Sequence, residues 1–147
     1  MSDLAQVAAL VVAAFAALAG VLGAWRWWTV APSRAFWALC RSAQALCVGY
    51  ALLAGVLALT GFRPATSLFW LYALLPLAVS FVGEQLRVLS AQTVLDARGL
   101  PDAQAVGDLD ADGQRSVVLA IVRREVGVMS VACLVIAFLA LRAAGTA

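Results

Sequence analysis

The chain has 147 residues, of which 65% are hydrophobic and 12% charged, and its formal net charge is +2. Soluble domains are roughly half apolar and a quarter charged, so this composition excludes a water-soluble globular protein. We expect one compact unit, a single transmembrane domain over residues 1–147, whose remaining apolar surface is covered by the lipid bilayer.

The composition also argues against enzyme and metal chemistry. The chain has no histidine, and all of its basic residues are arginines, so the most common general base and metal ligand is missing. Cys40, Cys47 and Cys133 form no C-x-x-C pair, and we interpret them as small apolar packing residues. We therefore expect no catalytic residue, no cofactor and no nucleic-acid partner.

Four hydrophobic stretches predict four transmembrane helices. The first, at residues 4–25, contains no charge and, at ~1.5 Å per residue, is long enough to cross a ~30 Å hydrocarbon layer. It is preceded by Met1, Ser2 and Asp3 rather than by the basic region of a cleaved signal, so we expect it to remain in the mature chain. The other spans are predicted at about residues 35–60, 67–87 and 120–141.

Short segments with loop chemistry separate the first three spans. We predict the first loop at Trp27, Trp28, Pro32 and Ser33, with the indole rings at the depth of the lipid headgroups. The sequence Gly-Phe-Arg-Pro at residues 61–64 predicts a tight second loop.

The third helix is predicted to continue beyond the membrane to Arg98. Residues 84–98 contain no glycine or proline, and the run Gly99–Pro101 that follows is typical of a helix end. The fourth helix is predicted to begin near Asp112 as its N-cap, after an acidic loop at about residues 99–113. The predicted fold class is all-α: a polytopic membrane protein with a four-helix transmembrane bundle whose helices three and four extend into the cytoplasm.

The arginines predict the orientation of the bundle. Only Arg63 and Arg142 lie on the side of the second loop, and all the others lie on the side of the first and third loops. The positive-inside rule places the first and third loops in the cytoplasm. We therefore expect both termini outside a cell (plasma) membrane.

Three of the spans meet charged residues at nearly the same depth. Counted inward from the outer loops, about 16 to 19 uncharged residues, or ~24 to 28 Å of helix, precede the first charge in each. Glu84 and Arg87 are three residues apart and share a helix face, which Arg41 and Glu125 can reach from neighbouring helices. The whole predicted intramembrane polar cluster is Arg41, Gln44, Glu84, Gln85, Arg87, Arg124 and Glu125.

Three roles are open for this predicted cluster. Unpaired charges at that depth are costly, so the residues can pair across helices and hold them in register. They can instead line a cytoplasm-facing vestibule, in which arginines attract anions or Glu84 and Glu125 relay protons. The arginines can also bind lipid headgroups.

Small residues at four-residue spacing predict close helix contacts. Ala16, Gly20 and Ala24 follow this pattern in the first helix, and Ala51 and Gly55 follow it in the second. The pattern leaves open whether the partner is another helix of this chain or a second copy.

The acidic loop resembles half of a calcium site. Residues 108–113 match D-x-D-x-D-G, but the twelfth position of the loop is Leu119 instead of the required glutamate. Asp108, Asp110 and Asp112 are therefore candidate metal ligands only, against the alternative of a solvated acidic turn next to the fourth helix.

These observations predict a small non-enzymatic membrane protein that packs as a homo-oligomer or as a subunit of a larger membrane complex. The alternative is a small oligomeric ion or proton channel or transporter. Its path would be lined by Arg41, Glu84, Arg87, Arg124 and Glu125. A lipid-acting membrane enzyme is the third hypothesis, with Glu84 as its only credible buried acid.

Overall fold

The computed structural model describes residues 1–147, and every regular element in it is a helix. Four of the helices are long and apolar enough to cross a membrane. In chain order the elements are α1 Ser2–Thr29, α2 Arg34–Leu59, α3 Leu68–Ala97, the short α4 Ala103–Gly107 and α5 Ala111–Ala144.

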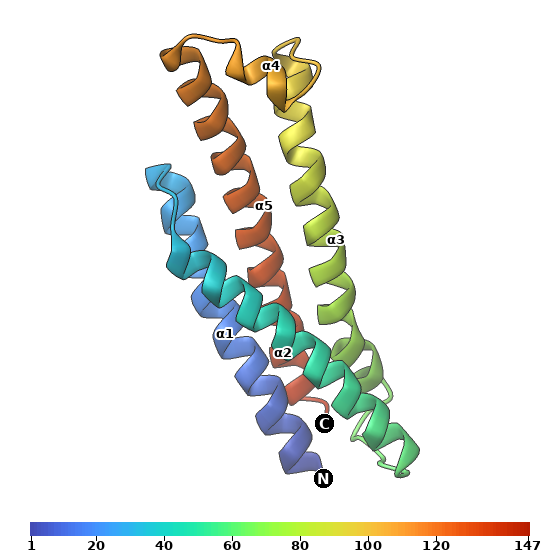
Figure 1. Cartoon of the computed structure of the whole chain (residues 1–147). Coiled ribbons are helices and arrows are strands. Elements are labelled where there is room, and N and C mark those ends of the chain that lie inside the picture. The colour runs from blue at the N-terminus through green and yellow to red at the C-terminus, as the bar shows by residue number, and fades with distance from the viewer.

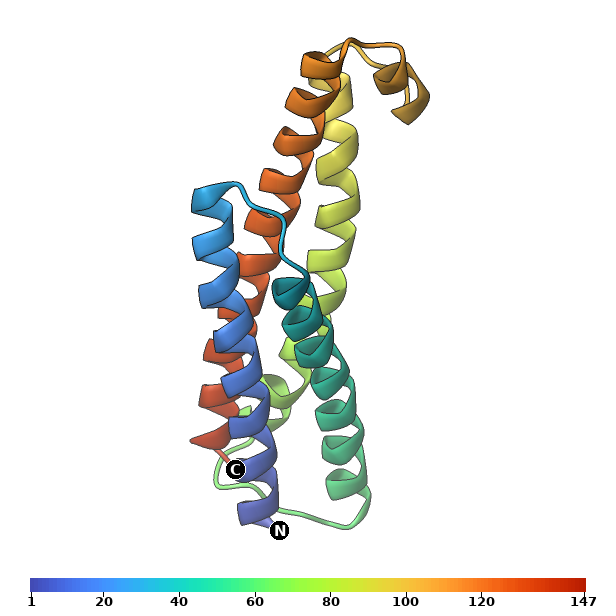
Figure 2. The ribbon, with the colours of Figure 1, turned by 60° about the vertical axis from the view of Figure 1, so that its left-hand side comes forward.

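The four long helices form an antiparallel bundle (Figure 1). α5 packs most extensively against α1 and α3, whereas α2 packs mainly on α1 and α3 and meets α5 only through a few buried side chains near Phe36 and Cys40. Both termini lie at the same end of the bundle as the α2–α3 connection (Figures 1 and 2). At the other end, α3 and α5 continue past the α1–α2 connection as a pair, joined by the segment that contains α4 (Figure 2).

The contact between α1 and α5 is built from small residues. Ala16 and Gly20 are buried, and a Cβ atom on Gly20 would lie 3.2 Å from the main-chain nitrogen of Leu134. This approach also lets the Ser130 hydroxyl donate a hydrogen bond of 2.8 Å to the Gly20 carbonyl. Two residues of the small-residue pattern of the first helix, Ala16 and Gly20, therefore serve a contact within this chain, whereas Ala24 is exposed. Gly55 on α2 has no neighbour within 4 Å of its Cβ position.

The prediction that Trp27 and Trp28 belong to the first loop is wrong. α1 continues to Thr29 and ends at Val30, which has a left-handed φ of 49°. No glycine or proline occurs between Gly23 and Pro32, so nothing local stops the helix at the tryptophans. The Trp27 ring also lies against Gly127 of α5, where a Cβ would be 2.9 Å from the Trp27 Cδ1 atom.

The acidic loop is more structured than predicted. Residues 103–107 form α4, with Asp102 accepting a hydrogen bond of 2.8 Å from the Ala105 amide. The cap of α5 is Asp110 rather than Asp112, because its carboxylate accepts from the Gly113 amide at 2.9 Å. Asp112 lies instead in the first turn, where its charge is favourable to the helix dipole.

The end of α3 agrees with the prediction. Arg98 is the last residue before Gly99, which has the left-handed φ of 67° that glycine adopts without a steric cost. The Leu100 amide then donates to the Leu95 carbonyl at 3.0 Å, which satisfies one of the free carbonyls of the last turn.

Candidate functional site

Five polar side chains from three helices form one hydrogen-bonded network with Glu84 at its centre. Glu84 Oε1 accepts from Arg41 Nη1 at 2.6 Å and from Gln44 Nε2 at 2.8 Å. Glu84 Oε2 accepts from Arg87 Nε at 3.0 Å, and Arg87 Nη1 lies 3.5 Å from Glu125 Oε1. We call Arg41, Gln44, Glu84, Arg87 and Glu125 the polar cluster.

Helical spacing places each pair of the polar cluster on one face. Arg41 and Gln44 are three residues apart on α2, and Arg41 Nη1 also donates to Gln44 Oε1 at 2.7 Å. Glu84 and Arg87 have the same spacing on α3. The Arg87 guanidinium lies 5.6 Å from the centre of the Trp37 ring, so an aromatic residue of α2 also helps to fix it.

The polar cluster is most exposed on the α2 side. The side chain of Arg41 is 53% exposed, whereas those of Glu84 and Arg87 are 24% and 26% exposed. Both carboxylates, Glu84 and Glu125, have an arginine partner. In this arrangement the polar cluster links α2 to α3 and α3 to α5.

Two of the predicted cluster residues lie elsewhere. Gln85 is exposed on α3, and Arg124 is exposed on α5. Each follows or precedes a cluster member directly, and consecutive residues of a helix point about 100° apart. Arg124 and Glu125 therefore cannot face the same neighbour, and Arg124 borders a separate groove.

The structure brings together two cysteines that sequence reasoning treated as independent fillers. The Sγ atoms of Cys40 on α2 and Cys133 on α5 are 3.7 Å apart, and both side chains are buried. Nothing in the sequence signals this contact, because the residues are 93 positions apart and meet only through the packing of α2 across the bundle.

The acidic loop does not form the candidate metal site. Asp110 uses its carboxylate to cap α5, and no group of three or more histidine, cysteine, aspartate or glutamate residues is placed to hold a metal ion. Asp108, Asp110 and Asp112 are therefore described better as parts of a solvated turn.

Comparisons of the chain with protein-family models, with curated proteins and with solved structures found no match.

Proposed function

We propose that the chain is a non-enzymatic multi-pass membrane protein that assembles through the outer face of α2, either with a second copy or with a helix of another subunit. The observation that carries this proposal is a seam of exposed small residues on α2. Its members are Ala38, Ser42, Ala45 and Gly49. Their spacing of four, three and four residues places them in one stripe along the helix.

The seam has the shape that helix packing in lipid requires. Lipid gives apolar helices no hydrophobic reason to associate, so close backbone approach over small residues is the main source of their attraction. A Cβ atom on Gly49 would meet nothing within 4 Å. Within the chain, Ala16 and Gly20 of α1 are already covered by α5, whereas the small residues of the α2 seam are exposed.

The polar cluster supports this role by fixing α2. α2 makes few contacts with α5, so its rotation depends on α1, α3 and the bonds from Arg41 and Gln44 to Glu84. A fixed rotation presents the seam in one direction. The half-exposed guanidinium of Arg41 lies beside the seam, where an acidic side chain of a partner would find a charge to pair with.

Bulky residues in the seam test the proposal. The double substitution Ala45→Leu with Gly49→Leu should lower the association constant of the assembly about tenfold or more, because the backbones of the two helices could no longer approach closely. Ala14→Leu, on the exposed face of α1, is the control and should assemble normally. The number of photobleaching steps of singly labelled chains in liposomes gives the number of copies in each assembly, and gentle purification from the native membrane detects another subunit. The proposal is contradicted if the chain is a monomer in liposomes and if its purification from the native membrane also brings down no stoichiometric partner.

The orientation is part of the proposal. The end of the bundle that carries α4 holds Arg98, Arg115 and Arg123, whereas Arg63 and Arg142 lie at the end with the termini. This asymmetry favours a cytoplasmic α3–α4–α5 hairpin and external termini in the plasma membrane.

Labelling from the two sides tests this orientation. A cysteine introduced as Asp110→Cys, with the three native cysteines replaced by alanine, should react with an impermeant maleimide in inverted vesicles only. Reaction in intact cells would show that the orientation is the opposite of the one proposed. A chain that stays monodisperse in buffer without detergent would exclude the membrane itself.

A further inference from the structure

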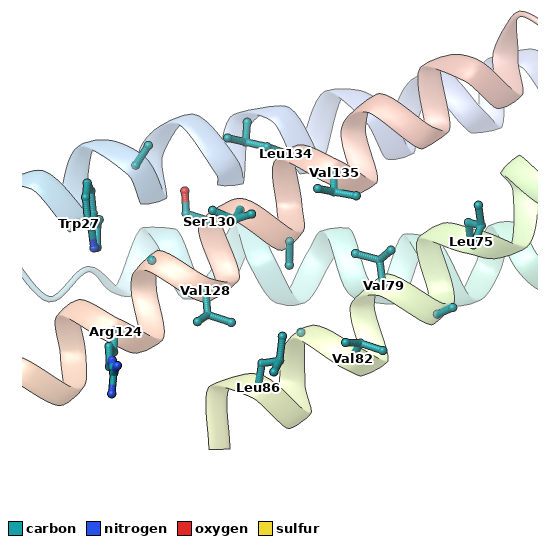
Figure 3. A pocket seen from close by; sticks show the side chains of 16 residues that line it. Trp27, Leu75, Val79, Val82, Leu86, Arg124, Val128, Ser130, Leu134 and Val135 are labelled. Carbon is teal, nitrogen blue, oxygen red and sulfur yellow. The ribbon is translucent and has the colours of Figure 1, made fainter. Parts of the chain in front are cut away.

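A long apolar groove runs along the outer side of α3 and α5, on the other side of α5 from α2. Its volume is about 930 Å³, within the range of ligand sites. Branched side chains form its walls: Leu75, Val79 and Val82 from α3, and Val128 and Val135 from α5 (Figure 3). Val131 of α5 also lines the groove.

Small residues form the floor of the groove. At Gly83 a Cβ atom would lie 3.0 Å from the Cβ of Ala132, so α3 and α5 approach closely there. Gly83, Ala132 and Ala78 all line the groove. The α3 residues along it, from Leu75 to Leu86, span ~16 Å of helix, so the groove has the elongated shape of an extended chain rather than that of a round pocket.

One end of the groove is basic. Arg124 and Trp27 line the groove and also line a second cavity of about 690 Å³, to which Arg98 and Arg123 contribute. The Arg123 guanidinium lies 5.3 Å from the centre of the Trp27 ring, and Arg98 Nη1 donates to the Ser116 hydroxyl at 2.9 Å.

These three arginines have no acidic partner. Every ion pair of the structure lies in the polar cluster, between Arg41 or Arg87 and Glu84 or Glu125. Three guanidinium groups beside one cavity therefore leave an unbalanced positive charge at one end of the apolar groove. Arginine presents its donors in a planar fork that matches a phosphate.

We infer that the groove and the second cavity together bind one anionic phospholipid of the surrounding bilayer. One acyl chain lies in the groove between α3 and α5, and the phosphate lies among Arg98, Arg123 and Arg124. Trp27 lines both the groove and the second cavity, and an indole ring is the side chain that favours the membrane interface, where a lipid headgroup would lie. Basic pockets between transmembrane helices are a known type of headgroup site. The charge favours this occupant over an apolar helix, which would leave the arginines unpaired.

The inference is tested by titrating the purified chain in detergent with dioleoyl phosphatidylglycerol or dioleoyl phosphatidylcholine, followed by native mass spectrometry. The anionic lipid should bind about tenfold more tightly than the zwitterionic one. Arg123→Gln with Arg124→Gln should remove most of this difference. Arg115→Gln removes a positive charge from α5 outside both cavities and should leave it unchanged.

The groove is tested separately by filling it. Ala78→Phe should weaken binding of both lipids, whereas Val88→Phe, exposed on α3 and outside the groove, should not. If the glutamine variants fold poorly, Arg124→Lys is the variant to use instead. It keeps the positive charge and should retain the preference for the anionic lipid. Equal affinity for the two lipids overturns the inference, and so does glycerol 3-phosphate binding as tightly as the whole lipid. A change of oligomeric state in Ala78→Phe without loss of lipid would show a helix in the groove instead.

Discussion

The hydroxyl of Ser130 on α5 donates a hydrogen bond of 2.8 Å to the main-chain carbonyl of Gly20 on α1, across the most extensive helix contact of the bundle. A side chain reaches the backbone of a neighbouring helix only where that helix has no side chain in the way. Gly20 meets this condition, because a Cβ atom there would lie 2.6 Å from Leu134 Cδ2. The packing of small residues and the polar contact between α1 and α5 therefore depend on each other.

Ser130→Ala should lower the free energy of unfolding by about 0.5–1 kcal/mol, the usual contribution of one hydrogen bond between membrane helices. The control is Ser90→Ala, since the Ser90 hydroxyl bonds the Leu86 carbonyl of its own helix at 2.7 Å. Denaturation in mixed detergent micelles measures both. Equal effects of the two substitutions would show that the bond to Gly20 contributes nothing specific.

Gly23→Ala should destabilise the bundle by about 1–3 kcal/mol, the usual cost of overpacking. A Cβ atom at Gly23 would lie 2.5 Å from Phe36 Cε2 and 2.9 Å from Ser130 Cβ, so α1, α2 and α5 would have to separate. Gly55→Ala has open space instead and should stabilise α2 by about 0.5–1 kcal/mol through helix propensity. The same denaturation assay compares them, and a tolerated Gly23→Ala would disprove the close three-helix contact.

Glu84→Gln should destabilise the chain more than Arg41→Ala does. The first substitution leaves Arg41 without a carboxylate and weakens the bonds of Arg87, at a cost of about 1–3 kcal/mol for partly buried groups. Arg41 is half exposed, so its loss should cost about 1 kcal/mol or less. Unfolding free energies give the order, and the reverse order would mean that Glu84 does not hold the polar cluster together.

The level of the polar cluster could be predicted from the sequence because it depends on length alone. Helices of nearly equal uncharged length, packed with their ends aligned, bring their first charges to one height. Five of the seven predicted residues do meet. Arg124 and Gln85 do not, since depth says nothing about which way a side chain points around the helix.

Features that depend on tertiary packing could not be predicted. The contact of Cys40 with Cys133 depends on how α2 crosses the bundle, and the groove depends on how far α3 and α5 are apart. The predicted N-cap of α5 differs from the observed one by two residues because Asp110 and Asp112 both have a carboxylate that can cap a helix. Only the fold of residues 103–110 decides between them.

Tyr50→Phe should leave the stability unchanged or raise it by about 1 kcal/mol. The Tyr50 ring is buried in the apolar core, and its hydroxyl has no hydrogen-bond partner, so removing the oxygen removes an uncompensated desolvation cost. Tyr72→Phe is the control on α3. A loss of more than about 1 kcal/mol in Tyr50→Phe would show that a partner, such as a bound water, satisfies the hydroxyl.

Oxidation should join Cys40 to Cys133 and leave Cys47 free. The first two Sγ atoms are 3.7 Å apart, so a bond of about 2.05 Å requires an approach of roughly 1.7 Å, within the reach of side-chain rotation and small helix shifts. Cys47 lies two turns from Cys40 on the same helix, about 10 Å away, too far for a disulfide. After treatment with diamide, the denatured chain should take up one maleimide instead of the three taken up by the reduced chain. Cys133→Ala should take up two with or without diamide, because its remaining thiols cannot pair within the chain. Uptake of three by the treated wild-type chain would show that the packing between α2 and α5 holds the two sulfur atoms apart.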